Sequence, residues 1–152
     1  MKIRIGADHG GFELREALIN LLKADHEIMD RGAISHDPSD DYPDFAKLVA
    51  NDIASRKADF GILICTTGIG MSITANKVTG VRAALVHAKG DAKMARAHNN
   101  ANVLVLGSKH QTVETAITHT KEFINTDFEG GRHARRLSKM ECIVDSCGTP
   151  NC

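Results

Sequence analysis

The sequence is poor in the features that mark several large classes of protein. Its 152 residues contain no tryptophan, one tyrosine, three prolines and four cysteines. No low-complexity tract occurs, and no apolar stretch approaches the roughly 18 residues that a membrane-spanning helix needs. The formal net charge is zero, so no long-range field favours nucleic acid or an anionic membrane. We therefore expect no nucleic acid and no membrane among its partners.

The beginning of the chain and the cysteines bear on its cellular location. The first residues, MKIRIGAD, lack the charged-then-apolar layout of a signal peptide. Cys142, Cys147 and Cys152 are spaced differently from the C-x2-C pairs of zinc sites, and no histidine follows them. We expect a cytoplasmic protein in which these three cysteines are free thiols rather than metal ligands.

The alternation of short β-branched runs with amphipathic stretches predicts an α/β fold. This pattern is typical of repeated βα units and a mostly parallel sheet. We expect one domain over residues 1–145 and a short tail over residues 146–152, since domains cluster around about 100–150 residues. The predicted architecture is a three-layer α/β/α sandwich with about five strands, whose order the sequence leaves open.

The expected elements place several polar residues at the ends of strands. The expected strands cover residues 2–7, 26–30, 60–65, 81–87 and 103–107. The expected helices cover residues 12–24, 44–57 (capped by Asp44 after Pro43), 71–77, 91–98, 112–125, and a last segment from about residue 133. Ligands of open parallel sheets bind beyond the carboxyl ends of the strands. The polar residues at those ends are therefore the candidates for a functional site.

Cys65 ends the apolar run FGILIC and begins the loop CTTGIG. Backbone N–H groups in such a loop, and at the start of the following helix, favour an anion and so the thiolate form of Cys65. This makes Cys65 a candidate base or nucleophile; a buried core cysteine is the alternative. The loop matches neither a P-loop, nor a dinucleotide fingerprint, nor a Cys-x5-Arg phosphatase loop. We expect it to hold an oxyanion.

Two histidines are candidate proton-transfer groups. His98 lies in the polar setting AHNNANVLVLG, and His9 follows Asp8 directly. An imidazole can accept and donate a proton near neutral pH. His98 precedes its strand, so it reaches the carboxyl end of the sheet only by folding back or from a neighbouring subunit.

Arg132 and Arg136 follow a Gly-Gly pair and lie four residues apart. This spacing places them on one face of a helix, where two guanidinium groups suit a phosphate. A solvated basic face is the alternative on spacing alone. The preceding glycines indicate a specific turn before the helix, and this favours the phosphate site over a solvated basic face.

Five segments occur in this order along the chain: GADHGG, DDYPDFA, GILICTTGIGMSITANKVTGVRAALV, HNNANVLVLGSK and FEGGRHARR. Together they resemble the type B ribose-5-phosphate isomerase family, which also includes allose- and galactose-6-phosphate isomerases. The resemblance extends from about residue 3 to residue 140. It implies a Rossmann-like sheet and interconversion of ribose 5-phosphate and ribulose 5-phosphate through an enediolate, without metal or other cofactor. It also implies a homodimer or tetramer with shared active sites.

The resemblance further implies a role for each candidate residue. It implies that Cys65 is the base at C1 and C2, that Thr67 helps move protons at the sugar oxygens, and that His98 opens the ring. The implied catalytic residues are Cys65, His98, Thr67 and Asp8. The implied substrate-binding residues are Asp8, His9, Thr66, Thr67, Gly68, Ile69, Gly70, Asn99, Lys109, Arg132 and Arg136, with His9, Lys109 and the two arginines holding the phosphate. A six-carbon sugar phosphate, or a non-catalytic phosphosugar-binding module, is the alternative function.

Two positions depart from the family pattern. Thr66 stands where the family usually has glycine, so a positive φ there would be strained; otherwise the side chain narrows the pocket beside C1. Lys109 stands where an arginine is usual, and it offers a point charge instead of a planar fork. We therefore expect a weaker hold on the phosphate there, or a sugar of different length.

Overall fold

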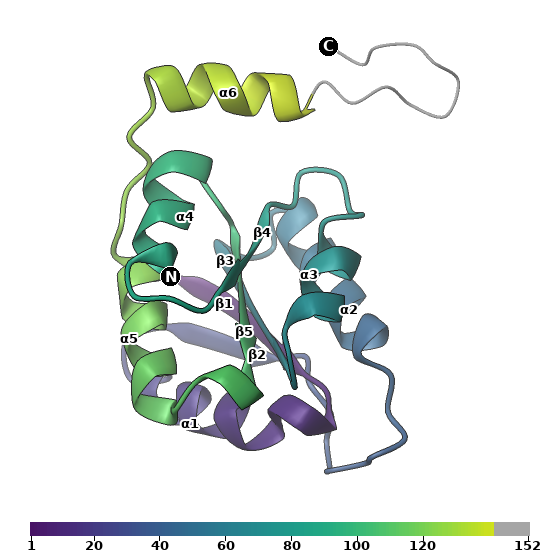
Figure 1. The fold of residues 1–152 in the computed structure, drawn as a ribbon. Helices are drawn as coiled ribbons and strands as arrows, with labels where there is room; N and C mark the ends of the chain where they lie inside the picture. Colours follow the sequence, from purple (N-terminus) through teal and green to yellow (C-terminus); the bar gives the residue numbers. More distant parts are fainter. Residues whose placement is uncertain (142–152) are drawn as a thin grey trace, which may run out of the picture.

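Five runs rich in apolar residues form one parallel sheet in the computed structural model, which describes residues 1–141 (Figure 1). The strands are β1 (Lys2–Ala7), β2 (Glu27–Asp30), β3 (Phe60–Cys65), β4 (Ala83–Val86) and β5 (Val103–Gly107). Their order is β2-β1-β3-β5-β4, and every neighbouring pair is parallel. The predicted α/β fold with five strands is confirmed. The predicted domain boundary at 145 and the three tail cysteines lie outside the described residues.

Helices cover both faces of the sheet and complete the three predicted layers. They are α1 (Phe12–Leu22), α2 (Tyr42–Ala54), α3 (Ile69–Ala75), α4 (Asp91–Asn99), α5 (Val113–Ile124) and α6 (Arg132–Glu141), with short 3-10 turns η1 (His9–Gly11) and η2 (Ser108–His110). Helices α1, α4 and α5 lie on one face and α2 and α3 on the other, whereas α6 extends beyond the sandwich (Figure 1). No helix in the described part of the chain is long and apolar enough to cross a bilayer.

Two helices begin earlier than predicted. Helix α2 starts at Tyr42, so Asp44 lies inside the first turn and is not the cap. Pro43 explains the earlier start, because its fixed φ suits the first turn of a helix. Helix α3 starts at Ile69, directly after Gly68, which takes the left-handed conformation.

The sheet separates two apolar cores, and this explains why its central strands are apolar throughout. In β3, Ile62 and Ile64 pack with α1, α4 and α5, whereas Leu63 and Cys65 pack with α2 and α3. Successive strand residues point to opposite faces, so a strand covered on both faces has no position for a polar side chain. Each such buried side chain stabilises the fold by about 1.5–3 kcal/mol. Cys65 thus ends β3 on the α2 and α3 face.

Candidate active site

The loops that follow β1, β3 and β5 meet where these strands end. This side of the sheet, at the carboxyl ends of its strands, is here called the carboxyl edge. These strands are parallel neighbours, so their carboxyl ends lie side by side. The Ser108 hydroxyl donates to the Gly10 carbonyl at 2.6 Å, and the Lys109 N–H donates to the Thr66 carbonyl at 3.0 Å. The structure therefore brings together the candidates predicted on these loops. They form the cysteine half-site: Asp8, His9, Cys65, Thr66, Thr67, Gly68, Ile69, Gly70 and Lys109.

The sulfur of Cys65 accepts a hydrogen bond from the backbone of the loop that follows it. The Gly68 N–H donates to the Cys65 Sγ at 3.1 Å, and the cysteine is only 5% exposed. This turn requires glycine at position 68, where φ is +78° and a Cβ would collide with Leu85 and lie 3.2 Å from the Leu106 carbonyl oxygen. An N–H directed at sulfur orients it and stabilises negative charge there. The geometry fits a proton-transferring thiolate.

Thr66 fills the space between two loops and is not strained. Among the described residues, only Arg56 and Asn100 combine a side chain with positive φ, so of the two alternatives for Thr66 the strained one does not apply. A Cβ on Gly10 would collide with the Thr66 hydroxyl, which shows that this side chain lies against the loop after β1. Its effect on the pocket beside C1 stays a prediction.

A hydroxyl beside the start of α3 and an aromatic ring from the start of α2 lie at the same edge. The Ile69 N–H donates to the Thr67 Oγ1 at 3.3 Å, so this hydroxyl lies at the first turn of α3. The Tyr42 ring lies against Gly70, since a Cβ there would approach it to 2.5 Å. Tyr42 was not predicted as a site residue. Its place in the segment DDYPDFA, as the one tyrosine of the chain, was the available signal.

Asp8 is a buried carboxyl group at the end of β1. Its Oδ1 accepts a hydrogen bond from the Gly11 N–H at 3.2 Å, which caps η1. Burial raises the pKa of Asp8 above its ordinary value, and the neighbouring His9 opposes this effect. A carboxyl group that binds its proton more tightly is better suited to exchange it during a reaction.

His9 is tied to a carboxylate that sequence reasoning missed. Asp40 Oδ1 accepts a hydrogen bond from the His9 N–H at 3.1 Å and lies 2.6 Å from the His9 Nδ1. This side-chain hydrogen bond raises the pKa of His9, so the ring holds its proton to higher pH. Asp40 belongs to the acidic run SDDY, which the sequence marked only as part of a polar loop.

His98 and Asn99 lie at the opposite edge of the sheet, here called the amino edge. They end α4, and β5 begins only four residues after Asn99. Cys65 pairs with Gly107 at the far end of β5, and four strand steps span about 13 Å. Within one chain His98 therefore does not fold back onto Cys65, and that alternative is wrong.

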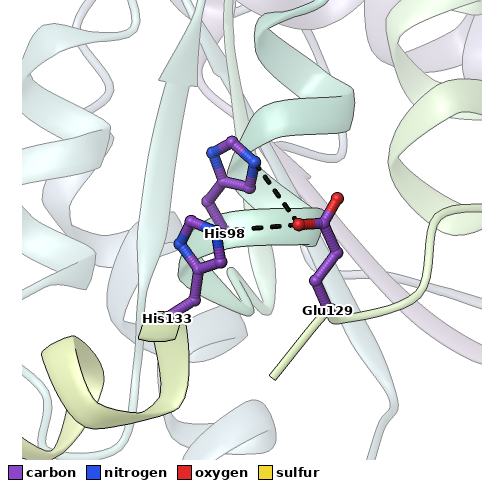
Figure 2. Close-up of side chains that lie close together, drawn as sticks. All are labelled: His98, Glu129 and His133. Atoms are coloured by element: carbon purple, nitrogen blue, oxygen red, sulfur yellow. Dashed lines mark ion pairs between the residues drawn. The ribbon is translucent and has the colours of Figure 1, made fainter. Parts of the chain in front are cut away.

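A carboxylate and a second histidine surround His98 (Figure 2). The Nε2 atoms of His98 and His133 lie 3.7 Å and 3.6 Å from Glu129 Oε2, and the two rings stack with centroids 4.1 Å apart. Burial, followed by the charges of His98 and Arg132, lowers the pKa of His133. Neither Glu129 nor His133 was predicted, although both stand in the segment FEGGRHARR with helical spacing.

The cluster at the amino edge suits an anion better than a metal ion. Two imidazoles and a carboxylate are a donor set that metals use. However, the Arg132 Nε donates to the His133 Nε2 at 3.4 Å, so a cation already lies on one donor atom. Arg132 and Arg136 are exposed on α6 after the predicted turn, in which Gly130 and Gly131 both have positive φ. We call this set the histidine half-site: His98, Asn99, Glu129, Arg132, His133 and Arg136.

Comparison with known protein families matches residues 3–140 to the family Ribose/Galactose Isomerase. The chain belongs to this family. Within the ribose/galactose isomerases, ribose-5-phosphate isomerase B of Escherichia coli is 38% identical over 143 residues, which cover 93% of this chain and 95% of that protein. The predicted family membership is confirmed.

Solved structures of ribose-5-phosphate isomerase B share the fold. The Thermotoga maritima structure is 48% identical with a TM-score of 0.90, over 93% of this chain and 98% of that one. The Mycoplasma genitalium structure, which has ribulose 5-phosphate bound, is 44% identical with a TM-score of 0.89, over 92% of this chain and 93% of that one. The division into two half-sites thus occurs on a sheet that these isomerases have in common.

Proposed function

We propose that the chain is an aldose–ketose isomerase that interconverts ribose 5-phosphate and ribulose 5-phosphate. The observation that carries the proposal is the Gly68 N–H on the Cys65 Sγ, at the carboxyl edge of a ribose/galactose isomerase sheet. The ribulose 5-phosphate bound to the Mycoplasma genitalium relative supports a five-carbon substrate. Because such substrates are charged metabolites that do not cross membranes unaided, we also propose a cytoplasmic location.

In this proposal Cys65 acts as the base. Its thiolate takes the proton from C2 of the open-chain aldose; the electron pair of that bond forms the C1–C2 double bond, and the carbonyl oxygen at C1 becomes an oxyanion. The hydroxyl proton of O2 passes to O1, the carbonyl forms at C2, and return of the proton from Cys65 to C1 gives the ketose. Backbone N–H groups of the loop from Thr66 to Gly70, together with Asn99 of the partner subunit, stabilise the oxyanion, and Thr67 helps exchange protons at the sugar oxygens. Loss of one such donor typically costs about 10²–10³ in rate.

The complete site in this proposal needs two copies of the chain. One copy supplies the cysteine half-site, and the other supplies His98, which with the first copy's Asp8 opens the sugar ring. Ile69 and Ile73 of α3 are 52% and 58% exposed beside the cysteine loop, and apolar surface of this kind is typical of subunit contacts. A twofold arrangement completes two sites at once.

Cations from both half-sites hold the phosphate in this proposal. His9 and Lys109 come from one copy, and Arg132 and Arg136, both exposed on α6, come from the other. Guanidinium groups bind phosphate oxygens in pairs, whereas Lys109 supplies a point charge. A six-carbon substrate is the second candidate, because Lys109 and Thr66 are the two departures from the family pattern within the cysteine half-site.

A turnover assay with purified protein tests the function. We expect the highest kcat/KM on ribose 5-phosphate, and lower values on allose 6-phosphate and galactose 6-phosphate. A preference for either six-carbon sugar would reverse the order of the two candidates, and no turnover on any of the three would leave only a phosphosugar-binding module. Since the chemistry needs no metal or other cofactor, we expect dialysis against EDTA to leave kcat unchanged.

A further inference from the structure

The carboxylate of Asp40 contacts His9 through both its backbone and its ring. One oxygen, Oδ1, accepts from the His9 N–H at 3.1 Å and lies 2.6 Å from Nδ1. The two residues are 31 positions apart, so this contact joins the polar loop between β2 and α2 to η1. The contact uses Nδ1 and prevents the ring from turning, which leaves Nε2 to donate to a ligand.

Burial makes this carboxylate dependent on a positive partner. The Asp40 side chain is only 11% exposed, and its Oδ2 is buried with no hydrogen-bond partner in the part of the chain that the structure describes. A buried carboxylate is costly unless a cation lies beside it. The His9 ring, at hydrogen-bond distance, supplies that cation when it is protonated.

The other charged groups around His9 do not compete for the ring. Asp8 precedes it in the chain, and its Oδ1 accepts from the Gly11 N–H. Asp37 accepts from the Ser39 N–H at 2.9 Å and its hydroxyl at 2.6 Å, so it is bonded within its own loop. His36 meets His9 edge to face, with centroids 5.9 Å apart. Asp8, Asp37 and Asp40 all favour a proton on His9, but only Asp40 contacts the ring.

We propose that Asp40 is a positioning residue that holds His9 protonated and directs its Nε2–H toward the phosphate of the substrate. The inference rests on the proposed phosphate-binding role of His9. A free imidazole is mostly neutral above pH 7 and binds a phosphate dianion poorly. The hydrogen bond from Asp40, which raises the pKa of His9, extends the charged form into the neutral range. The buried Asp40 carboxylate thus keeps His9 charged, and the charged ring binds anions more tightly at the mouth of the cysteine half-site.

The first test measures the protonation of His9 directly by NMR titration of the free protein. Asp40→Asn keeps an oxygen to accept from the His9 N–H but removes the charge, so we expect the pKa of His9 to fall. The matched control is Asp37→Asn, which removes a nearby charge that has no contact with the ring and should lower the pKa less. An unchanged pKa of His9 in Asp40→Asn would overturn the proposal while leaving the proposed isomerase activity standing.

The second test measures anion affinity by calorimetry with sulfate, whose charge is constant over the pH range used. At pH 5.5, where His9 is protonated in both proteins, we expect Asp40→Asn to bind sulfate at least as tightly as the wild type. At pH 8 we expect the Kd of Asp40→Asn for sulfate to be higher than that of the wild type by on the order of tenfold. A loss of equal size at both pH values would show that Asp40 acts only on loop structure, and would overturn the proposal.

A third variant separates this proposal from the one on which it rests. His9→Gln should weaken sulfate binding at pH 5.5, because it removes the protonated ring itself. If His9→Gln binds sulfate as the wild type does, then His9 does not hold the phosphate, and the proposed phosphate site fails together with the inference. If it weakens binding and Asp40→Asn shows the pH-dependent loss, both stand.

Discussion

At the scale of single residues, Cys65 belongs to an apolar core and also to the proposed reaction site. Its side chain packs in the apolar layer under α2 and α3, yet its sulfur accepts the N–H of Gly68. A core role alone needs no donor on the sulfur. The hydrogen bond therefore supports the catalytic interpretation, which the sequence had left open beside the packing one.

Replacement of Cys65 by alanine tests this interpretation. We expect Cys65→Ala to lower kcat by about 10³-fold or more, since a positioned base contributes roughly 10²–10⁴ and no other thiol reaches this edge within the described residues. Substrate binding should change little, because the phosphate contacts remain. Proton exchange at C2, followed by NMR in D₂O, is the measurement, and Cys147→Ala is the control. Exchange at the wild-type rate would mean that another group is the base.

Asp8 carries a cost in stability that its environment explains. Burial raises its pKa in the folded protein, so the ionised carboxylate is more stable in the unfolded chain. The stabilising contribution of this group is therefore present at low pH and is lost as the pH rises through the folded pKa. Such a cost at a strand end is typical of residues kept for function.

Asp8→Asn should relieve that cost. Asparagine keeps an oxygen for the Gly11 N–H but carries no charge, so we expect a higher Tm than the wild type at pH 7. The difference should disappear below pH 3.8, the ordinary pKa of the carboxyl group, where Asp8 is protonated in both states. Calorimetric melting across this range is the measurement, with the exposed Asp25→Asn as the control. A lower Tm at pH 7 would contradict the explanation.

At the scale of elements, the loop after β3 depends on one backbone conformation. Gly68 turns the chain so that its N–H points at the sulfur and α3 starts at the next residue. The loop after β5 crosses close by, since a Cβ on Gly107 would lie 2.6 Å from the Thr67 carbonyl oxygen. Packing between loops thus leaves no room for a different turn.

A pair of glycine variants distinguishes the effect of collisions between the loops from the effect of backbone strain. Gly68 and Gly80 have almost the same φ, +78° and +82°, but a Cβ on Gly80 meets nothing within 4 Å. We expect Gly80→Ala to cost about 1 kcal/mol of unfolding free energy, and Gly68→Ala about 2–4 kcal/mol, since the latter adds collisions. Denaturant unfolding gives both values. Only Gly68→Ala should also lower kcat; equal effects of the two variants would mean that the loop tolerates the side chain.

At the scale of the whole molecule, the parallel topology places the two half-sites at opposite edges of one sheet. Helix α4 returns the chain from the carboxyl edge to the amino edge, and this leaves His98 near the start of β5 while Cys65 lies at the end of β3. Helix α6 carries Arg132 and Arg136 beyond the sandwich (Figure 1). Neither edge contains all the groups that the proposed reaction requires.

Mixing two inactive variants tests whether the sites are shared. Cys65→Ala and His98→Asn should each be strongly impaired on ring-closed ribose 5-phosphate. When the two are unfolded together in equal amounts and refolded, half of the dimers pair one variant with the other, and each of these has one intact site. We expect recovery of about one quarter of the wild-type activity. No recovery would show that each chain forms its site alone; each variant refolded by itself is the control.

The sequence by itself determined the elements, the family and the residues of the cysteine half-site, because these depend on local pattern. The continuous apolar runs of β3 and β5, the glycines of the CTTGIG loop and the Gly130-Gly131 turn can all be recognised within a few residues. Only the tertiary structure decided which candidates meet. Strand order, the contact of Asp40 with His9 across 31 positions, the stacking of His133 on His98 and the separation of His98 from Cys65 depend on long-range packing. Two residues can both be close in sequence to the same strand and still lie at its opposite ends. The sequence pattern does not show at which end each residue lies.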